Sequence, residues 1–225
     1  GHTNPQPNKG WIWKRFVENP KYNYRLIIAP TSENTNLPQH YIESMKDEYD
    51  PEYYRINVLG EFGNYSSGLV VKNFSDENIK TLTYNKDLPL YLTCDFNVDP
   101  MCWVIAHKDD KNVYFFDELV LENTDTQHSI ETFIRRYPGH RNKIVICGDA
   151  AGNFRSTQSE FNNYMIMRRA LEAHGYNVEF KVRGWNPRIL NRIQAFNARI
   201  CNAKGERHVF VDKKCKWLLH NIYNL

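Results

Sequence analysis

Two aspartates, Asp95 and Asp149, each follow an apolar run of the kind that forms a buried strand. Asp95 comes directly after Leu90–Cys94, and Asp149 comes directly after Lys143–Gly148. If these two strands lie side by side, both carboxylates emerge at one edge of a sheet. Carboxylates that close repel each other unless a cation lies between them, and divalent cations with oxygen ligands suit this arrangement. Two such ions can clamp the attacking and leaving oxygens of a phosphodiester. The pair therefore predicts a catalytic site in which Asp95 and Asp149 are also the metal ligands.

Other acids near these strands are weaker candidates. Taken singly, each aspartate also fits strand termination or helix capping, although the loop after Asp149 argues against a helix starting there. Asn97 and Asp99 keep oxygen atoms in the turn after Asp95, and Asp99 precedes a proline, which is typical of a turn. Glu118 could face the same metal site or the solvent. The histidines lack the spacing of a zinc site.

The elements that position the two aspartates predict an α/β fold with one mixed sheet. Three strands joined by tight turns form an antiparallel meander, and the later strands alternate with helices, which indicates parallel crossovers. This is the strand order of the RNase H-like fold. The expected strands are Leu90–Cys94, Met101–His107, Asn112–Val120, Lys143–Asp149, Asn177–Val182 and His208–Val211. The expected helices run from Ile130 to Tyr137, from near Ser159 to Gly175, from Pro187 to Asn202 and from Cys215 onward.

The stretch before residue 75 is rich in Asn, Pro and Tyr, and we expect it to be largely irregular. Arg25–Ala29 is a short apolar run ended by a proline, which predicts a strand, and Pro38–Tyr49 suits a short helix. The polar segment Asn73–Pro89 is typical of a linker. The phosphate-loop pattern G-x-x-x-x-G-K-[ST] is absent, so we expect no ATPase activity from this sequence by that route.

Charge is unevenly distributed along the sequence. Residues 178–225 carry ten Lys/Arg and three Asp/Glu, whereas residues 91–177 carry nine and twelve. A basic segment beside an acidic centre suits a polyanion held near a metal site, although a solvated basic surface is the plainer interpretation. Our candidates for contacts with DNA phosphates are Lys181, Arg183 and a helical stripe of Arg188, Arg192 and Arg199.

The five cysteines form no C-x-x-C pair, and their odd number argues against a disulfide framework. No apolar run approaches the roughly 20 residues that span a membrane, and there is no signal-peptide pattern. We therefore expect a protein of a reducing cytoplasm.

Several motifs, taken in order, make the sequence similar to the large subunit of the tailed-bacteriophage DNA-packaging terminase. They are Thr93–Pro100, Cys147–Gly152, Asn186–Asn197 and Val211–Leu218, with Thr3-Asn4-Pro5, Gly10–Trp13 and Leu59–Phe62 upstream. The resemblance implies a remnant of the ATPase domain and linker over residues 1–75, and an RNase H-like nuclease domain over residues 76–225. It also implies that Asp95 and Asp149 match two of the family's metal-binding acids, with the third expected beyond Leu225.

The function implied by this resemblance is cleavage of concatemeric double-stranded viral DNA by an endonuclease that uses Mg²⁺ or Mn²⁺, with two ions expected. The implied partners are double-stranded DNA, the portal protein and the small terminase subunit, and the implied location is the host cell cytoplasm. Two alternatives stay open. One is a junction resolvase or recombinase nuclease on the same fold, and the other is a non-catalytic module for DNA binding or assembly.

Overall fold

The computed structural model describes residues 10–63, 69–97, 99–153 and 161–224 of the 225. These residues divide into two compact units, each built from segments that are distant in sequence. Unit 1 comprises Gly1–Phe74, Ile189–His208 and Tyr223–Leu225, and unit 2 comprises Ser75–Arg188 and Val209–Ile222. The break between Phe74 and Ser75 lies next to the expected domain boundary, but residues 189–208, expected in the nuclease domain, group with unit 1.

Unit 1 is helical and has little regular structure near its start. Its elements are α1 (Trp11–Trp13), η1 (Lys14–Glu18), η2 (Thr31–Glu33), α2 (Gln39–Glu48), α3 (Pro51–Asn57) and α6 (Ile189–Ile200). The helix expected at Pro38–Tyr49 is confirmed as α2. The strand expected at Arg25–Ala29 is wrong, because this run has no regular structure and pairs with no described strand. Ile27 in its centre is 75% exposed, so its apolar side chains do not form a strand of the sheet core.

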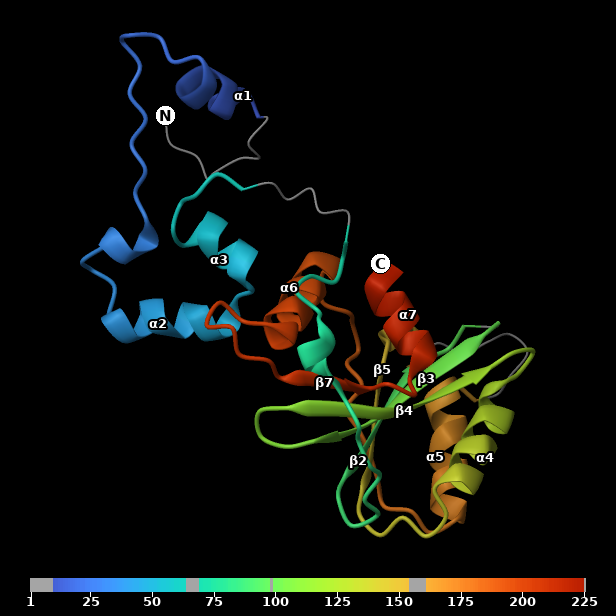
Figure 1. The fold of residues 1–225 in the computed structure, drawn as a ribbon. Helices are drawn as coiled ribbons and strands as arrows, with labels where there is room; N and C mark the ends of the chain where they lie inside the picture. Colours follow the sequence, from blue (N-terminus) through green and yellow to red (C-terminus); the bar gives the residue numbers. More distant parts are fainter. Residues whose placement is uncertain (1–9, 64–68, 98, 154–160, 225) are drawn as a thin grey trace. The chain divides into compact units, whose positions relative to one another are not determined.

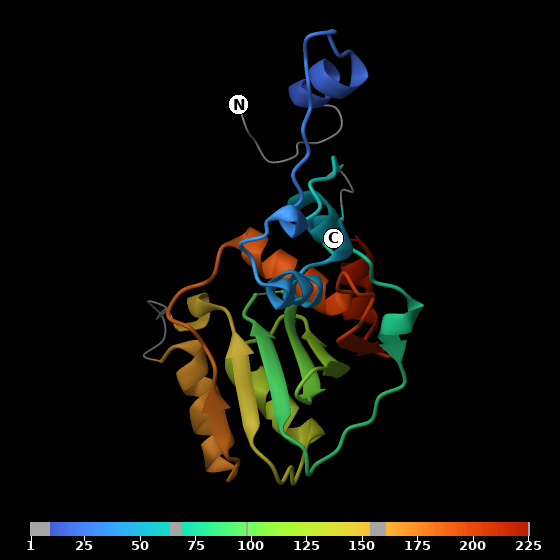
Figure 2. The ribbon, with the colours of Figure 1, turned by 90° about the vertical axis from the view of Figure 1, so that its left-hand side faces the viewer.

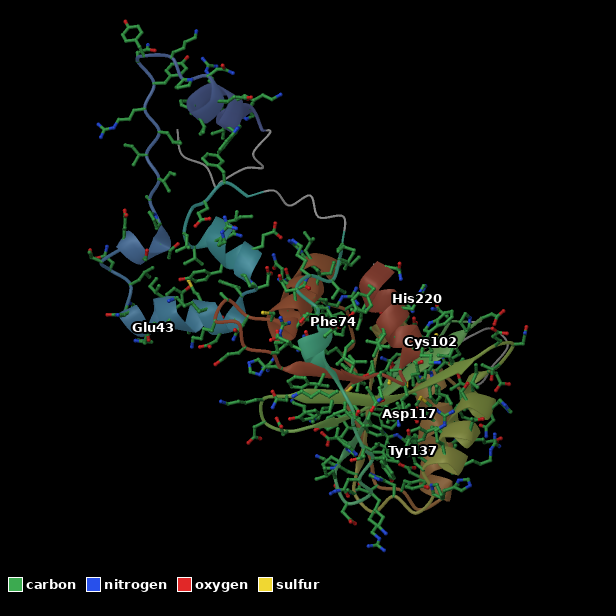
Figure 3. All side chains as sticks on the ribbon, viewed as in Figure 1. Glu43, Phe74, Cys102, Asp117, Tyr137 and His220 are labelled. Atoms are coloured by element: carbon green, nitrogen blue, oxygen red, sulfur yellow. The ribbon has the colours of Figure 1, made fainter. Side chains whose placement is uncertain are left out.

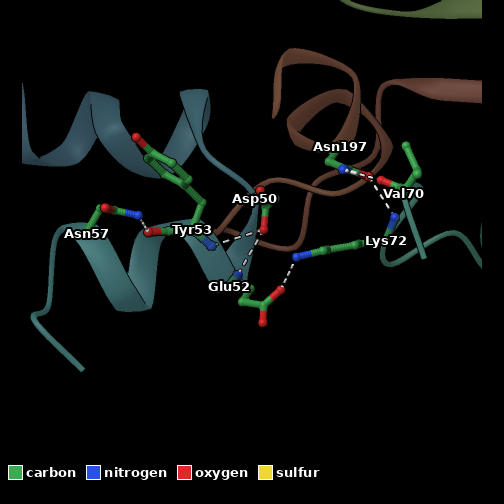
Figure 4. Close-up of polar contacts among 7 residues, drawn as sticks. All are labelled: Asp50, Glu52, Tyr53, Asn57, Val70, Lys72 and Asn197. Carbon is green, nitrogen blue, oxygen red and sulfur yellow. Dashed lines mark hydrogen bonds and ion pairs between the residues drawn. The ribbon is translucent and has the colours of Figure 1, made fainter. Parts of the chain in front are cut away.

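Polar contacts hold the elements of unit 1 together (Figure 4). The side chain of Asp50 accepts hydrogen bonds from the backbone N–H groups of Glu52 and Tyr53 and so caps α3, which begins with Pro51. On α6, the buried amide of Asn197 donates to the carbonyl of Val70 and accepts from the N–H of Lys72 at 2.7 Å. These bonds join α6 to a segment more than 120 residues earlier in the chain.

Unit 2 contains one mixed sheet of seven strands in the order β1-β7-β4-β3-β2-β5-β6 (Figures 1 and 2). The pairs β2–β3 and β3–β4 are antiparallel, and the pairs β2–β5, β5–β6, β4–β7 and β1–β7 are parallel. The strands are β1 (Ile79–Lys80), β2 (Leu90–Asp95), β3 (Met101–Lys108), β4 (Val113–Leu121), β5 (Ile144–Gly148), β6 (Val178–Phe180) and β7 (Val209–Asp212). The expected α/β, RNase H-like mixed sheet is confirmed, and β1 and β7 extend it beyond the meander.

Helices α4 (Thr126–Arg136) and α5 (Asn163–Ala173) pack against each other and cover one face of the sheet (Figure 1). The core between them and the sheet contains Leu90, Leu92 and Cys94 of β2, with Phe133 of α4 and Met167 of α5. Each fully buried side chain of this kind contributes about 1.5–3 kcal/mol. Because side chains alternate along a strand, Thr93 and Asp95 point to the opposite face.

Local sequence explains where these helices begin. Asp125 caps α4 by accepting from the N–H of His128 at 2.7 Å, and Asn162 caps α5 by accepting from the N–H of Met165 at 2.9 Å. The start of α5 expected near Ser159 lies outside the described residues.

Unit 2 also contains the short helices η3 (Asp76–Asn78) and η4 (Ala150–Asn153), and α7 (Lys216–Asn224) begins within it. Across both units, no described helix has the length and hydropathy to cross a membrane.

Candidate functional site

Asp95 and Asp149 lie at the carboxyl ends of two neighbouring parallel strands. Asp95 is the last residue of β2, and Asp149 directly follows β5. The two strands pair in a register that joins Thr93 to Cys147 and Cys94 to Gly148. Continuing this register by one residue sets Asp95 opposite Asp149, on strands about 4.8 Å apart. The prediction that these two strands are neighbours is therefore confirmed, and the alternation of side chains along β2 directs Asp95 to the sheet face that α4 and α5 do not cover.

Cys102, which is labelled in Figure 3, lies on β3, the strand that pairs with β2 on the side opposite to β5. It is the partner of Asp95 in the antiparallel register of β2 and β3. Burial, followed by the negative charge of Asp95, raises the pKa of the Cys102 thiol. The thiol is thus protonated at neutral pH and faces a carboxylate, a neighbour that the sequence alone did not indicate.

Hydrogen bonds fix both carboxylates. Asn97 donates its side-chain N–H to Oδ2 of Asp95 at 2.9 Å, so its amide nitrogen faces the aspartate rather than its oxygen. Oδ1 of Asp149 accepts from the backbone N–H of Ala151 and from the side-chain N–H of Asn186, each at 2.7 Å. Asn186 belongs to the motif noted in the sequence, but nothing in its local pattern placed it at Asp149.

Small and aromatic residues hold the backbone around Asp149. The hydroxyl of Tyr164 on α5 donates to the carbonyl oxygen of Asp149 at 2.8 Å. A Cβ added at Gly148 would lie 2.3 Å from that hydroxyl, and one at Gly152 would lie 2.5 Å from the ring of Phe96. Glycines on both sides of Asp149 therefore let the loop approach the aromatic side chains closely.

Glu118, the third predicted metal ligand, is hydrogen bonded to the start of α7. Its two carboxylate oxygens accept the backbone N–H groups of Trp217 and Leu218, at 2.9 and 2.8 Å. These are N–H groups of the first turn of α7, where a negative charge is favourable. Glu118 also lies on β4, two strands from β2, or about 10 Å across the sheet. The carboxylate of Glu118 thus caps the start of α7.

The predicted DNA-binding residues are all exposed but belong to both units. Lys181, Arg183 and Arg188 lie in the segment that follows β6 in unit 2, whereas Arg192 and Arg199 lie on α6 in unit 1. Arg188 precedes the first residue of α6, so the stripe expected on one helix contains two of its three arginines. Lys181 forms an ion pair with Glu179 at 3.3 Å, which lowers its availability for phosphate. Asp99 accepts from the N–H of Asn123 at 3.1 Å, as expected of a turn residue.

The structure resembles solved large terminases. No protein-family profile and no curated protein sequence matches the chain. The large terminase of a thermophilic bacteriophage, in complex with ATP-gamma-S, superposes with a TM-score of 0.61 at 13% identity, over 98% of this chain and 53% of that one. A second crystal form of the same phage protein gives a TM-score of 0.59 at 14% identity, over 96% and 51%.

An isolated domain shows a weaker likeness. The nuclease domain of the P22 large terminase gives a TM-score of 0.49 at 12% identity, over 70% of this chain and 78% of that domain. The chain spans about half the length of the full-length terminases it matches, and at these identities the likeness is one of fold. The terminase resemblance found in the sequence is therefore confirmed as a fold: this chain has the architecture of a terminase large subunit over the part that it covers, with an RNase H-like sheet in unit 2.

Proposed function

We propose that this chain carries a metal-dependent endonuclease that cuts double-stranded DNA during viral genome packaging. The observation that supports this most is the parallel pairing of β2 and β5, because Asp95 ends β2 and Asp149 directly follows β5. Concatemeric viral DNA as the substrate, the portal protein and the small terminase subunit as partners, and the host cytoplasm as the location belong to the same proposal.

The donor chemistry of this edge fits a small divalent cation. Mg²⁺ is commonly held by one or two carboxylates, with water and substrate phosphate as its other ligands. Asp95 and Asp149 supply two carboxylates. Among the described residues, no group of three or more His, Cys, Asp or Glu side chains is placed so that it could hold a metal ion. Mg²⁺ or Mn²⁺ bound here would supply positive charge to a phosphodiester. The expectation of two ions and that of Glu118 as a further metal ligand both stay predictions, and the Glu118 carboxylate also accepts two N–H groups at the start of α7.

The residues of the chain have separable tasks in this proposal. Asp95 and Asp149 bind and orient the cation, and the hydrogen bonds from Asn97 and Asn186 hold their carboxylates in place. Arg183 is exposed in the segment that leads to Asn186, where it attracts the phosphate backbone. Lys181, Arg188, Arg192 and Arg199 remain predicted phosphate contacts.

Plasmid cleavage in Mn²⁺ tests the proposal with isosteric variants. Asp95→Asn and Asp149→Asn remove a charge but keep an oxygen that accepts hydrogen bonds, so the loop can remain folded. We expect cleavage to fall below detection in both. Asp110→Asn is the matched control, because this exposed aspartate lies in the turn between β3 and β4 at the other end of these strands. Cleavage at the wild-type rate by either site variant would refute the assignment.

The same preparations distinguish the two alternatives. A strong preference for branched over linear DNA would favour a junction resolvase. Salt-sensitive DNA binding without Mn²⁺ binding would favour a non-catalytic module.

A further inference from the structure

A single amide, that of Asn186, touches both the side chain of Asp149 and the backbone that follows it. Its Nδ2 donates to Oδ1 of Asp149 at 2.7 Å, and its Oδ1 accepts from the N–H of Ala150 at 3.1 Å. The N–H of Ala151 donates to the same aspartate oxygen at 2.7 Å. The aspartate side chain is thereby held between the backbone of its own loop and a residue 37 positions later.

This contact requires the particular chemistry of an asparagine. A donor and an acceptor must be presented side by side, and the side-chain amide of asparagine supplies both, whereas aspartate lacks the donor at neutral pH and serine offers a single hydroxyl. The backbone of Asp149 is fixed separately by the hydroxyl of Tyr164, which bonds its carbonyl. Rotation of the carboxylate is restrained in addition by the bonds that its Oδ1 accepts, from the N–H of Ala151 and from Nδ2 of Asn186.

We propose that Asn186 is the positioning residue of this site, which orients the Asp149 carboxylate for a divalent cation. The inference rests on the proposed function, since it assumes that Asp149 is a metal ligand. Partners that orient a ligating carboxylate typically contribute a factor of about 10–100 to metal affinity. Asn186 therefore acts through Asp149 and contacts neither substrate nor cation in this assignment.

Asn186 also connects the basic segment to the site. Arg183 and Arg188 lie three residues before it and two residues after it, and all three belong to unit 2. The chain between Arg183 and Arg188 is thus anchored to the Asp149 loop at one point. DNA phosphates bound by these arginines are held on a segment that is hydrogen bonded to a proposed metal ligand.

Isothermal titration with Mn²⁺ alone tests the positioning role. We expect Asn186→Ala to weaken Mn²⁺ binding by about 10–100-fold. Asn142→Ala is the matched control: Asn142 precedes the other end of β5, and its amide donates to the carbonyl of Asp87 at 2.8 Å. The Mn²⁺ affinity of Asn142→Ala should equal that of the wild type. The melting temperatures of Asn186→Ala and Asn142→Ala should fall by similar amounts. Wild-type Mn²⁺ affinity in Asn186→Ala would overturn the inference.

Hydrogen exchange without metal supplies a second, independent measurement. Asn186 Nδ2 and the N–H of Ala151 are both donors, and both bond the same oxygen of Asp149. If Asn186 holds the carboxylate, the Ala151 N–H exchanges faster in Asn186→Ala than in Asn142→Ala. Unchanged exchange at Ala151 would overturn the positioning role, whereas a wild-type protein that binds no Mn²⁺ would overturn the proposed function itself.

Discussion

Replacing Gly148 by alanine should destabilise unit 2 through one identifiable contact. The new methyl group would lie 2.3 Å from the hydroxyl oxygen of Tyr164 and 3.0 Å from the carbonyl oxygen of Cys94. Tyr164 cannot move aside freely, because it is 5% exposed and its ring makes edge contacts with Phe96 and Phe180. The methyl group therefore displaces the hydroxyl that bonds the carbonyl of Asp149.

Two effects contribute to the expected loss in the free energy of unfolding of Gly148→Ala. Overpacking a well-packed site costs about 1–3 kcal/mol. Loss of the bond from the Tyr164 hydroxyl to the Asp149 carbonyl adds about 0.5–1.5 kcal/mol. We therefore expect Gly148→Ala to lower the free energy of unfolding by about 1.5–4.5 kcal/mol. Gly184→Ala is the control, because a Cβ there meets nothing within 4 Å and should change stability by less than about 0.5 kcal/mol.

Urea denaturation of both variants and of a double mutant measures this. Tyr164→Phe removes the oxygen nearest to the new methyl group, leaving the ring carbon at 3.3 Å. The double variant Gly148→Ala/Tyr164→Phe should then be more stable than the sum of the two single changes predicts, by about 1 kcal/mol or more. A Gly148→Ala protein as stable as Gly184→Ala, or strict additivity in the cycle, would refute this account of the packing.

Two further changes should be visible in the same denaturation experiments. Glu118→Ala removes the acceptor of two N–H groups at the start of α7 and should lower the free energy of unfolding by about 1–2 kcal/mol. Glu122→Ala is the control, because Glu122 is exposed and follows β4, and it should lower this free energy by less than about 0.5 kcal/mol. Burial lowers the pKa of His107, whose Nε2 accepts from the N–H of Asn85 and so requires a neutral ring. Because the folded state binds this proton less readily, stability should be constant above about pH 6.5 and decline as the pH falls below it, with a shallower decline in His107→Gln. Equal slopes in the two proteins would assign the decline to other groups.

The part of the site that could be predicted from the sequence is the part encoded locally. Two apolar runs, each directly followed by an aspartate, predicted two buried strands, and the meander with its crossovers predicted that they are neighbours. The contact of Asn186 with Asp149 could not be predicted in this way, because it depends on where the chain returns after 37 residues. Nor did a pattern indicate that Glu118 meets the start of α7, about 100 residues later.

The difference between local sequence signals and contacts with distant segments also explains where the rest of the fold departs from the prediction. Arg25–Ala29 has the composition of a strand, but a strand also requires a partner, and no described strand pairs with it. Conversely, β1 has only two residues in a polar segment, and its strand character comes from pairing with β7 rather than from its own sequence. Helix α3 was missed although Asp50-Pro51 is a readable start signal.

The hydrogen bonds of Asn197 have a consequence for shortening this protein. A fragment of residues 76–225 would keep the helix that carries Asn197 but lose the Val70 carbonyl and the Lys72 N–H that satisfy its amide. Asn197 is 2% exposed, and a buried polar group deprived of its partner costs about 1–3 kcal/mol. The N–H of Ala203 would also lose its acceptors, the carbonyls of Lys46 and Tyr49. A truncation at the boundary between Phe74 and Ser75 thus removes several non-local hydrogen bonds, and a shortened protein that keeps α6 is better begun before residue 46.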